Sequence, residues 1–274
     1  MNILIAADME GITGVVNWDQ VTAGHFEYPR FRALMTEDVN AAIQGAFEGG
    51  ASKVTVADGH ASGTNILIEQ LDPRAVINYS NSAPHSMIQG ISPDITGMIY
   101  IGYHARHGTA NAICDHTYSS RCVSNLWING TLTGEYGLNA ALAGYFGVPV
   151  IMVSGDQMAC AETIELLGKM PAAIVKVATG RHSAECLPPA QSHPLIKTAA
   201  KMAVQNLARG NSPKPFLPPS PVEILVELKS SDMADRAARI PGTERDGLRI
   251  RMVLPNMQQA YFGFRSILGM ASNS

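Results

Sequence analysis

Two carboxylates that are two residues apart follow an apolar segment at the start of the chain. Ile3–Ala7 predicts a strand, and Asp8 and Glu10 come directly after it. Side chains at positions i and i+2 project from the same face of extended backbone, so we expect the two acids to point the same way. Two like charges this close need a cation, a proton or water between them. This strand end is therefore a candidate metal site, and a solvated loop after an edge strand is the alternative.

Acids and imidazoles recur after other predicted strands. They are Asp58 and His60 after Lys53–Ala57, His104 after Gly97–Gly102, His116 in the segment that follows, and Glu135 after a predicted hairpin. The carboxyl ends of parallel strands form the edge of a sheet at which ligands bind, so we expect these side chains to converge there.

Each of these residues also has a purely structural interpretation. His60 would cap a tight turn, His104 would be a buried histidine bonded to the backbone, and His116 would lie in a surface loop. Glu135 would be an acid at the start of a helix, where the helix dipole favours a negative charge. The recurrence of Asp, Glu and His at one sheet edge nevertheless favours a shared site.

The types of side chain indicate the chemistry of such a site. Carboxylate and imidazole donors without a thiolate suit Zn, Mn, Co or Fe. Several carboxylates around one point suit two metal ions that share a bridging acid and that together activate a water and polarise a carbonyl or phosphoryl oxygen. The reaction class that this pattern predicts is metal-assisted hydrolysis.

Two further residues have candidate roles in the same region. Arg106 either orients a substrate carboxylate through its fork of donors or is a solvated loop charge. Cys114 stands beside Asp115 and His116, but the sequence supplies no third group that would orient a thiol nucleophile. The chain also lacks a phosphate-binding GxxxxGK[ST] loop, a GxGxxG sequence after a strand, HExxH and GxSxG.

The elements that must position these residues follow from the hydrophobic pattern. Strands are predicted at Ile3–Ala7, Lys53–Ala57, Ala75–Tyr79, Gly97–Gly102, Val150–Val153 and Ala172–Val177, with helices at Phe31–Phe47, Glu135–Phe146 and Gln157–Leu167. Asn129-Gly130 predicts a two-residue turn between strands within Val123–Thr133. Strands that alternate with helices predict an α/β fold with a mostly parallel sheet flanked by helices.

The character of the chain changes after Gly180. Leu195–Leu207 is amphipathic, and five prolines then stiffen Asn211–Pro221. Strands are predicted at Val222–Leu228 and Leu248–Leu254, with helices at Asp232–Ile240 and Met257–Met270. We therefore expect a metal-binding catalytic α/β domain over residues 1–180 and a smaller C-terminal α+β domain over residues 181–274, with a boundary between 180 and 211.

Composition excludes several classes of protein. The 274 residues are 46% hydrophobic with a net charge of −3, which predicts a packed globular protein without the basic face of a nucleic-acid partner. No apolar stretch approaches the ~20 residues of a membrane span. The start of the chain lacks the features of a signal peptide, and the four cysteines form no CxxC pair. We therefore expect a cytoplasmic protein with no membrane partner.

Several of these segments resemble the DppA-type zinc D-aminopeptidase family, over essentially the full length of the chain. The resemblance is carried by Asp8-Met9-Glu10-Gly11, Asp58-Gly59-His60, Gly102-Tyr103-His104-Ala105-Arg106, His116, and Gly134-Glu135-Tyr136-Gly137-Leu138-Asn139-Ala140. The opening motif of the family is SxDxEG, and Ala6 occupies its first position here.

The resemblance implies a site and an activity. Two zinc ions per subunit would be held by Asp8, Glu10, His60, His104 and Glu135, with Asp8 as the bridge and His116 as the catalytic residue. The protein would be a metallopeptidase that hydrolyses short peptides with an N-terminal D-amino acid, such as D-Ala, through a water activated by the dinuclear zinc site. A ring-stacked homodecamer with an inner chamber is also implied.

Two other functions compete with this one. The same pair of metals would serve an amidohydrolase or phosphoesterase that acts on a non-peptide small molecule, although no basic cluster beyond Arg106 is evident for a phosphate. A peptide-binding or scaffold protein that keeps a metal for stability is the second alternative.

Overall fold

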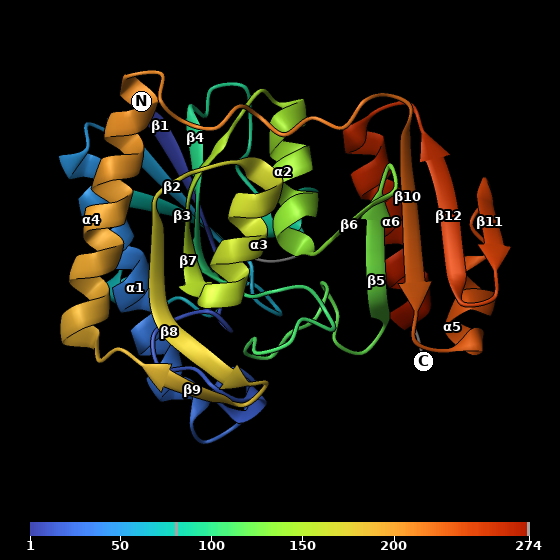
Figure 1. Cartoon of the computed structure of the whole chain (residues 1–274), viewed down its shortest axis with the longest axis horizontal. Coiled ribbons are helices and arrows are strands. Elements are labelled where there is room, and N and C mark those ends of the chain that lie inside the picture. The colour runs from blue at the N-terminus through green and yellow to red at the C-terminus, as the bar shows by residue number, and fades with distance from the viewer. Residues whose placement is uncertain (80–81, 273–274) are drawn as a thin grey trace.

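The computed structural model describes residues 1–79 and 82–272 and consists of two sheets with helices packed between and around them (Figure 1). Helices α1 and α4 lie together on one side of the first sheet, α2 and α3 lie on its other side, and the second sheet with α5 and α6 follows. The predicted α/β class is confirmed.

The first sheet has seven strands in the order β3-β2-β1-β4-β7-β8-β9. They are β1 (Asn2–Ala7), β2 (Lys53–Asp58), β3 (Ala75–Asn78), β4 (Gly97–Tyr103), β7 (Val150–Asp156), β8 (Ala172–Gly180) and β9 (Ser183–Cys186). All neighbouring strands are parallel except β8 and β9, which are antiparallel. Every residue of β4 and of β7 is buried, because helices cover both faces of the central strands.

Helices α1 (Tyr28–Glu48) and α4 (Pro189–Ala208) cover one face of this sheet. Side chains from both helices join Ile3 and Ile5 of β1 in one buried cluster. On the other face, Leu4 and Ala6 of β1 join side chains of α2 (Glu135–Tyr145) and α3 (Gln157–Leu167). Alternate residues of β1 thus supply two separate cores, as the side-chain period of a doubly covered strand requires. Three short 3-10 segments lie at Trp18–Gln20, Ile68–Gln70 and Ser86–Ile88.

The second sheet is antiparallel and has the strand order β11-β12-β10-β5-β6. Its strands are β5 (Val123–Ile128), β6 (Thr131–Thr133), β10 (Val222–Leu228), β11 (Thr243–Asp246) and β12 (Arg249–Leu254), accompanied by α5 (Ser231–Ala237) and α6 (Met257–Ser272). Asn129 and Gly130 both have positive φ, 47° and 79°, as the predicted two-residue turn between β5 and β6 requires.

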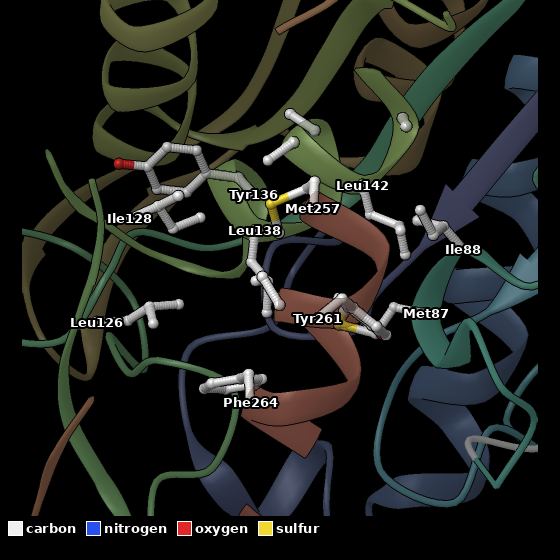
Figure 2. Packing of buried hydrophobic residues seen from close by; sticks show 14 of the residues in the cluster. Met87, Ile88, Leu126, Ile128, Tyr136, Leu138, Leu142, Met257, Tyr261 and Phe264 are labelled. Atoms are coloured by element: carbon white, nitrogen blue, oxygen red, sulfur yellow. The ribbon is translucent and has the colours of Figure 1, made fainter. Parts of the chain in front are cut away.

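The two sheets share a hydrophobic core. Figure 2 shows that Leu138 and Leu142 of α2 lie near Tyr261 of α6, with Phe264 and Leu126 of β5 beyond them. All of these side chains are at most 2% exposed, so α2 is packed from both sides. The helix that begins at Glu135 is therefore fixed by the first sheet and by the C-terminal helix together.

The sheets do not divide the chain at residue 180. Helix α4 lies after residue 180 but packs against α1 and the first sheet. The hairpin β5–β6 lies before residue 180 but belongs to the second sheet, where β5 pairs with β10. Within the predicted boundary range of 180–211, a boundary after Ala208 keeps α4 with the sheet that it covers.

Most predicted elements are present, and the differences are local. The helix predicted from Phe31 begins at Tyr28, because Pro29 suits the first turn of a helix. Strands β9 and β11 were not predicted; each has only four residues, too few for a clear alternation. Among the described residues, no helix has both the length and the apolar character needed to cross a membrane.

Two glycines allow the segment after β1 to lie against the end of β4. The Gly11 amide donates to the carbonyl of Gly102 at 2.8 Å, and the Asp8 amide donates to Ile101 at 2.8 Å. A Cβ at Gly102 would overlap the carbonyl oxygen of Asp8, and one at Gly11 would overlap that of Tyr103. Only glycine permits this backbone contact, which fixes the position of Asp8 relative to the end of β4.

We predict that Gly102→Ala destabilises the protein more than Gly108→Ala does. Both glycines have positive φ, 71° and 85°, so both substitutions carry the same conformational cost. A Cβ at Gly108 meets no described atom within 4 Å, whereas one at Gly102 meets backbone. Thermal unfolding should show a Tm for Gly102→Ala about 2–12 °C below that of Gly108→Ala, given an overpacking cost of about 1–3 kcal/mol. Equal Tm values would show that the segment after β1 moves away freely.

Candidate metal centre

The residues predicted from strand ends meet at one edge of the first sheet. Asp8 and Glu10 follow β1, His60 follows β2, His104 follows β4, and Glu135 is the first residue of α2. These five side chains and His116 are buried, with exposed fractions of 8% or less. Buried carboxylates and imidazoles in such number require compensation of charge by one another or by a cation.

His60 contacts both acids of the first strand end. Its Nδ1 lies 3.3 Å from Oδ1 of Asp8 and 3.1 Å from Oε2 of Glu10. His104 lies on the other side of Asp8, with Nε2 at 3.4 Å from Oδ2 and in close contact with Oε1 of Glu135. The two oxygens of Asp8 therefore face two different imidazoles.

A backbone carbonyl orients each imidazole of the site. His60 Nε2 lies 2.8 Å from the carbonyl of Val21, His104 Nδ1 lies 2.9 Å from that of Ala105, and His116 Nδ1 lies 2.9 Å from that of Cys114. Because a carbonyl oxygen only accepts, the ring nitrogen that faces it must donate. In a neutral ring the other nitrogen then presents its lone pair to the site, which is the usual arrangement around metal-bound histidines.

Four atoms of the cluster make no hydrogen bond within the described residues although they are fully buried. They are Oδ2 of Asp8, Oε2 of Glu10, Nε2 of His104 and Oε1 of Glu135. Ligand atoms of Asp8, Glu10 and His104 lie within 4.8 Å of one another, and so do those of His104, His116 and Glu135. Buried polar atoms that converge without hydrogen bonds, with only charged groups of the same cluster near them, fit divalent metal ions, and the mixed donor set suits zinc.

The electrostatics of the cluster favour positive charge. Burial opposes protonation of His60 and His104, but the neighbouring carboxylates outweigh it and raise the pKa of both rings well above 6.5. Burial and the charge of Glu10 raise the pKa of Asp8 to about 7. Burial likewise raises the pKa of Glu10, but His60 outweighs this and holds that pKa well below 4.5. The site thus attracts protons or cations to offset its three carboxylates.

His116 lies against the cluster and differs from the other imidazoles. Its ring stacks on that of His104 at 3.9 Å, and the indole of Trp18 meets it edge-on at 5.2 Å. Burial and the neighbouring His104 lower the pKa of His116 to about 4, so the ring is neutral at pH 7. A neutral ring with one nitrogen fixed by a carbonyl can accept a proton at Nε2 or bind a metal there.

Asp58 supports the site without facing it. Its Oδ2 accepts the amides of Asn65 and Ile66 at 2.6 and 2.7 Å, and its Oδ1 accepts Asn65 Nδ2 at 2.7 Å. Asn65 Nδ2 in turn reaches the carbonyl of His60 at 2.7 Å. Asp58 therefore closes the loop that carries His60.

The cluster opens into a cavity of about 480 Å³, a size that suits a small ligand. Its wall includes Trp18 from the 3-10 segment Trp18–Gln20, Tyr118 and Arg121 from the loop before β5, and Arg265 from α6. The sequence alone did not single out these four residues, because they lie far apart in the chain and outside any recognisable spacing. The C-terminal helix thus contributes to a site whose acids come from the first sheet.

Arg106 does not line this cavity in the described part of the chain. Its Nε lies 3.8 Å from Glu162 on α3, and its amide donates to the same carboxylate at 3.0 Å. The geometry therefore gives no support to the substrate-binding role predicted for Arg106.

Comparison with known proteins identifies relatives that match nearly the whole chain. The model of the peptidase family M55, described as D-aminopeptidase, matches residues 1–266. A D-aminopeptidase of Bacillus subtilis (strain 168) is 35% identical over 244 residues, which cover 89% of this chain and 87% of the relative.

A solved structure shares the fold. The Zn-dependent D-aminopeptidase DppA from Bacillus subtilis, a self-compartmentalizing protease, superposes with a TM-score of 0.96 at 33% identity. The match covers 100% of this chain and 99% of that one.

We predict that a divalent metal stabilises the folded protein through Asp8. Chelation should lower the Tm. Metal added to about 100 times its Kd should restore about 2.7 kcal/mol of the free energy of unfolding, which corresponds to a rise in Tm of roughly 5–10 °C. Differential scanning calorimetry with Zn²⁺ measures this directly. In Asp8→Asn the response to metal should be lost.

Asp156→Asn is the matched control. Asp156 is also fully buried, but its carboxylate caps α3 through the amides of Met158 and Ala159. This variant should lose stability and keep the metal response. A metal response retained in Asp8→Asn would remove Asp8 from the ligand set.

Proposed function

The chain belongs to the D-aminopeptidase family, and we propose that it is a zinc-dependent aminopeptidase that removes an N-terminal D-amino acid from short peptides. The observation that carries this proposal is the position of Asp8, whose two oxygens face His60 on one side and His104 on the other. A carboxylate between two imidazoles is suited to bridge two metal ions.

The proposed ligands follow from this arrangement. Asp8, Glu10 and His60 would surround one zinc ion, and Asp8, His104 and Glu135 the second. The support is the set of contacts around Asp8 and the buried atoms that lack hydrogen bonds within the described residues. Glu135 also benefits from its place in the first turn of α2, where the helix dipole stabilises its negative charge.

When bound, the zinc ions supply Lewis-acid activation of the peptide carbonyl and of a water molecule. The chain's own contribution to proton transfer is assigned to His116. The carbonyl of Cys114 fixes Nδ1 of His116 as a donor, which leaves Nε2 to accept a proton and to deliver it to the leaving amine. The edge of Trp18 and the ring of His104 hold the imidazole in this orientation.

The cavity supports a small substrate. A volume of about 480 Å³ admits a peptide of a few residues and excludes a folded domain. Arg121 and Arg265 line the same cavity as the acids, so its wall carries positive charge as well as the carboxylate cluster. This combination of charges matches a short zwitterionic peptide better than a phosphoester or a neutral amide.

Assembly and location are part of the same proposal. An assembly that encloses its active sites, which we propose to be a homodecamer, is supported by the likeness to a self-compartmentalizing protease. A reducing, cytoplasmic setting is supported by four cysteines that are all free thiols.

We predict that the protein releases D-alanine from D-Ala-D-Ala, that chelation abolishes this release, and that Zn²⁺ restores it. Chromatographic measurement of free amino acid, with L-Ala-L-Ala run in parallel, tests class, metal and stereochemistry together. Release from the L-peptide alone would keep the metallopeptidase and reject D-specificity. Turnover of a phosphoester far above that of either peptide would favour the phosphoesterase alternative.

We predict that His116→Ala keeps its full zinc content and loses about 100- to 10,000-fold in kcat, the range for a group that transfers a proton. His182→Ala is the control, because His182 lies 3.9 Å from the Cys114 thiol and outside the proposed ligand set. Metal content and turnover are measured on the same samples. Zinc lost together with activity would make His116 a ligand, and unchanged turnover would remove it from the mechanism.

A further inference from the structure

A lysine far from the acids in sequence holds the segment that carries them. Lys176 lies on β8, and its ammonium donates to the carbonyls of Glu10 at 2.7 Å, Ile12 at 2.8 Å and Val15 at 2.7 Å. These contacts span 161 to 166 residues of sequence and use all three donors of the ammonium. Lys176 is only 1% exposed and is not among the described residues that line the cavity.

The segment from Asp8 to Val15 is fixed from three directions. Hydrogen bonds to Ile101 and Gly102 fix its start against β4. Asp38 of α1 accepts the amide and the hydroxyl of Thr13, both at 2.8 Å. Lys176 holds carbonyls that alternate with these anchors along the segment, and of the three sets of contacts only that of Lys176 includes the backbone of Glu10, a proposed metal-binding residue.

Burial of an ammonium in this position has a cost in free energy, which these three contacts help to offset. Burial lowers the pKa of Lys176 from 10.5 to about 8, and the charges of Asp156 and Asp38 partly oppose this. Hydrogen bonds from a charged donor are stronger than those from a neutral one, and besides Lys176 the Ile12 carbonyl accepts only the longer bond from the Val15 amide, at 3.4 Å, among the described residues. Removal of the ammonium would deprive three buried carbonyls of this hydrogen-bond donor. The segment would then have to move for these carbonyls to reach water or other donors.

We infer that Lys176 is a positioning residue of the metal centre, which sets the place of the Glu10 carboxylate by holding the backbone carbonyls of Glu10, Ile12 and Val15. It acts through the backbone and does not touch substrate or metal. This inference rests on the proposed function, since it assigns Lys176 to the proposed metal site.

Titration of metal-depleted protein with Co²⁺ tests the inference without any peptide substrate. Lys176→Met keeps the apolar stem and removes the donors. Its apparent Kd for Co²⁺ should rise about 10- to 100-fold, as for other residues that orient metal ligands. The visible absorption bands of bound cobalt should also shift at saturation, because the angle of the Glu10 ligand changes. With saturating Zn²⁺, kcat should fall more than KM rises.

Thr163→Val is the matched control. The Thr163 hydroxyl is fully buried and donates to the carbonyl of Ala159 within α3, away from the segment that follows β1. This variant should lose stability and keep both the Co²⁺ affinity and the cobalt spectrum. Lys176→Gln, which retains an amide donor, is the second variant and should show a smaller change in the same direction.

The outcomes separate the inference from the proposed function. Wild-type affinity and spectrum in folded Lys176→Met and Lys176→Gln would show that Lys176 only stabilises the fold, and would overturn the inference alone. Failure of both variants to fold would likewise make Lys176 a folding requirement. Wild-type protein that binds no Co²⁺ would reject the proposed metal site and the inference with it.

Discussion

The repulsion among three buried carboxylates is the constraint on which the rest of this structure depends. Asp8, Glu10 and Glu135 come from two distant parts of the chain and are each at most 3% exposed. Like charges that are buried so near one another raise the free energy of the folded state unless positive charge lies between them. Two imidazoles partly meet this need, and the ligand atoms that converge around Asp8 are of the types that bind cations. Most other features of the site serve to hold these acids where they would not otherwise stay.

Contacts to the backbone of the surrounding segments hold these acids and imidazoles in place. Gly11 and Gly102 bring two strand ends into contact, Asp58 closes the loop of His60, and Lys176 holds three carbonyls, of which the first is that of Glu10. Each imidazole is turned by a carbonyl of a neighbouring loop. The side chains of the site are thus anchored by groups one step further from the cavity, which is how precise ligand geometry is usually maintained.

The sequence predicts the position of the site better than its walls. A parallel sheet collects its strand ends, so acids and histidines that follow strands can be expected to meet, and Asp8, His60 and His104 do so. Arg106 was expected to bind substrate at the same edge; its Nε lies 3.8 Å from Glu162, which is 56 residues later, and Arg106 is not among the described residues that line the cavity. Contacts between distant segments also explain why the pairing of β5 with β10 and the burial of Lys176 escaped prediction. A single lysine within the apolar strand Ala172–Val177 was the available signal, and local patterns do not say whether such a charge faces water.

The hairpin β5–β6 has a consequence for the order in which the molecule can mature. It stands in the chain between His116 and Glu135, yet its partner β10 begins only at Val222. While the polypeptide is still being synthesised, a chain that ends before Val222 has the strand ends of Asp8, His60 and His104 but lacks both the strand that fixes the hairpin and the helix that packs on α2. The corner that carries Glu135 is therefore completed last, when almost the entire chain has left the ribosome. In a nascent or truncated chain that ends before Val222, Glu135 is present but lacks the contacts of β10 and α6 that fix its surroundings in the complete chain.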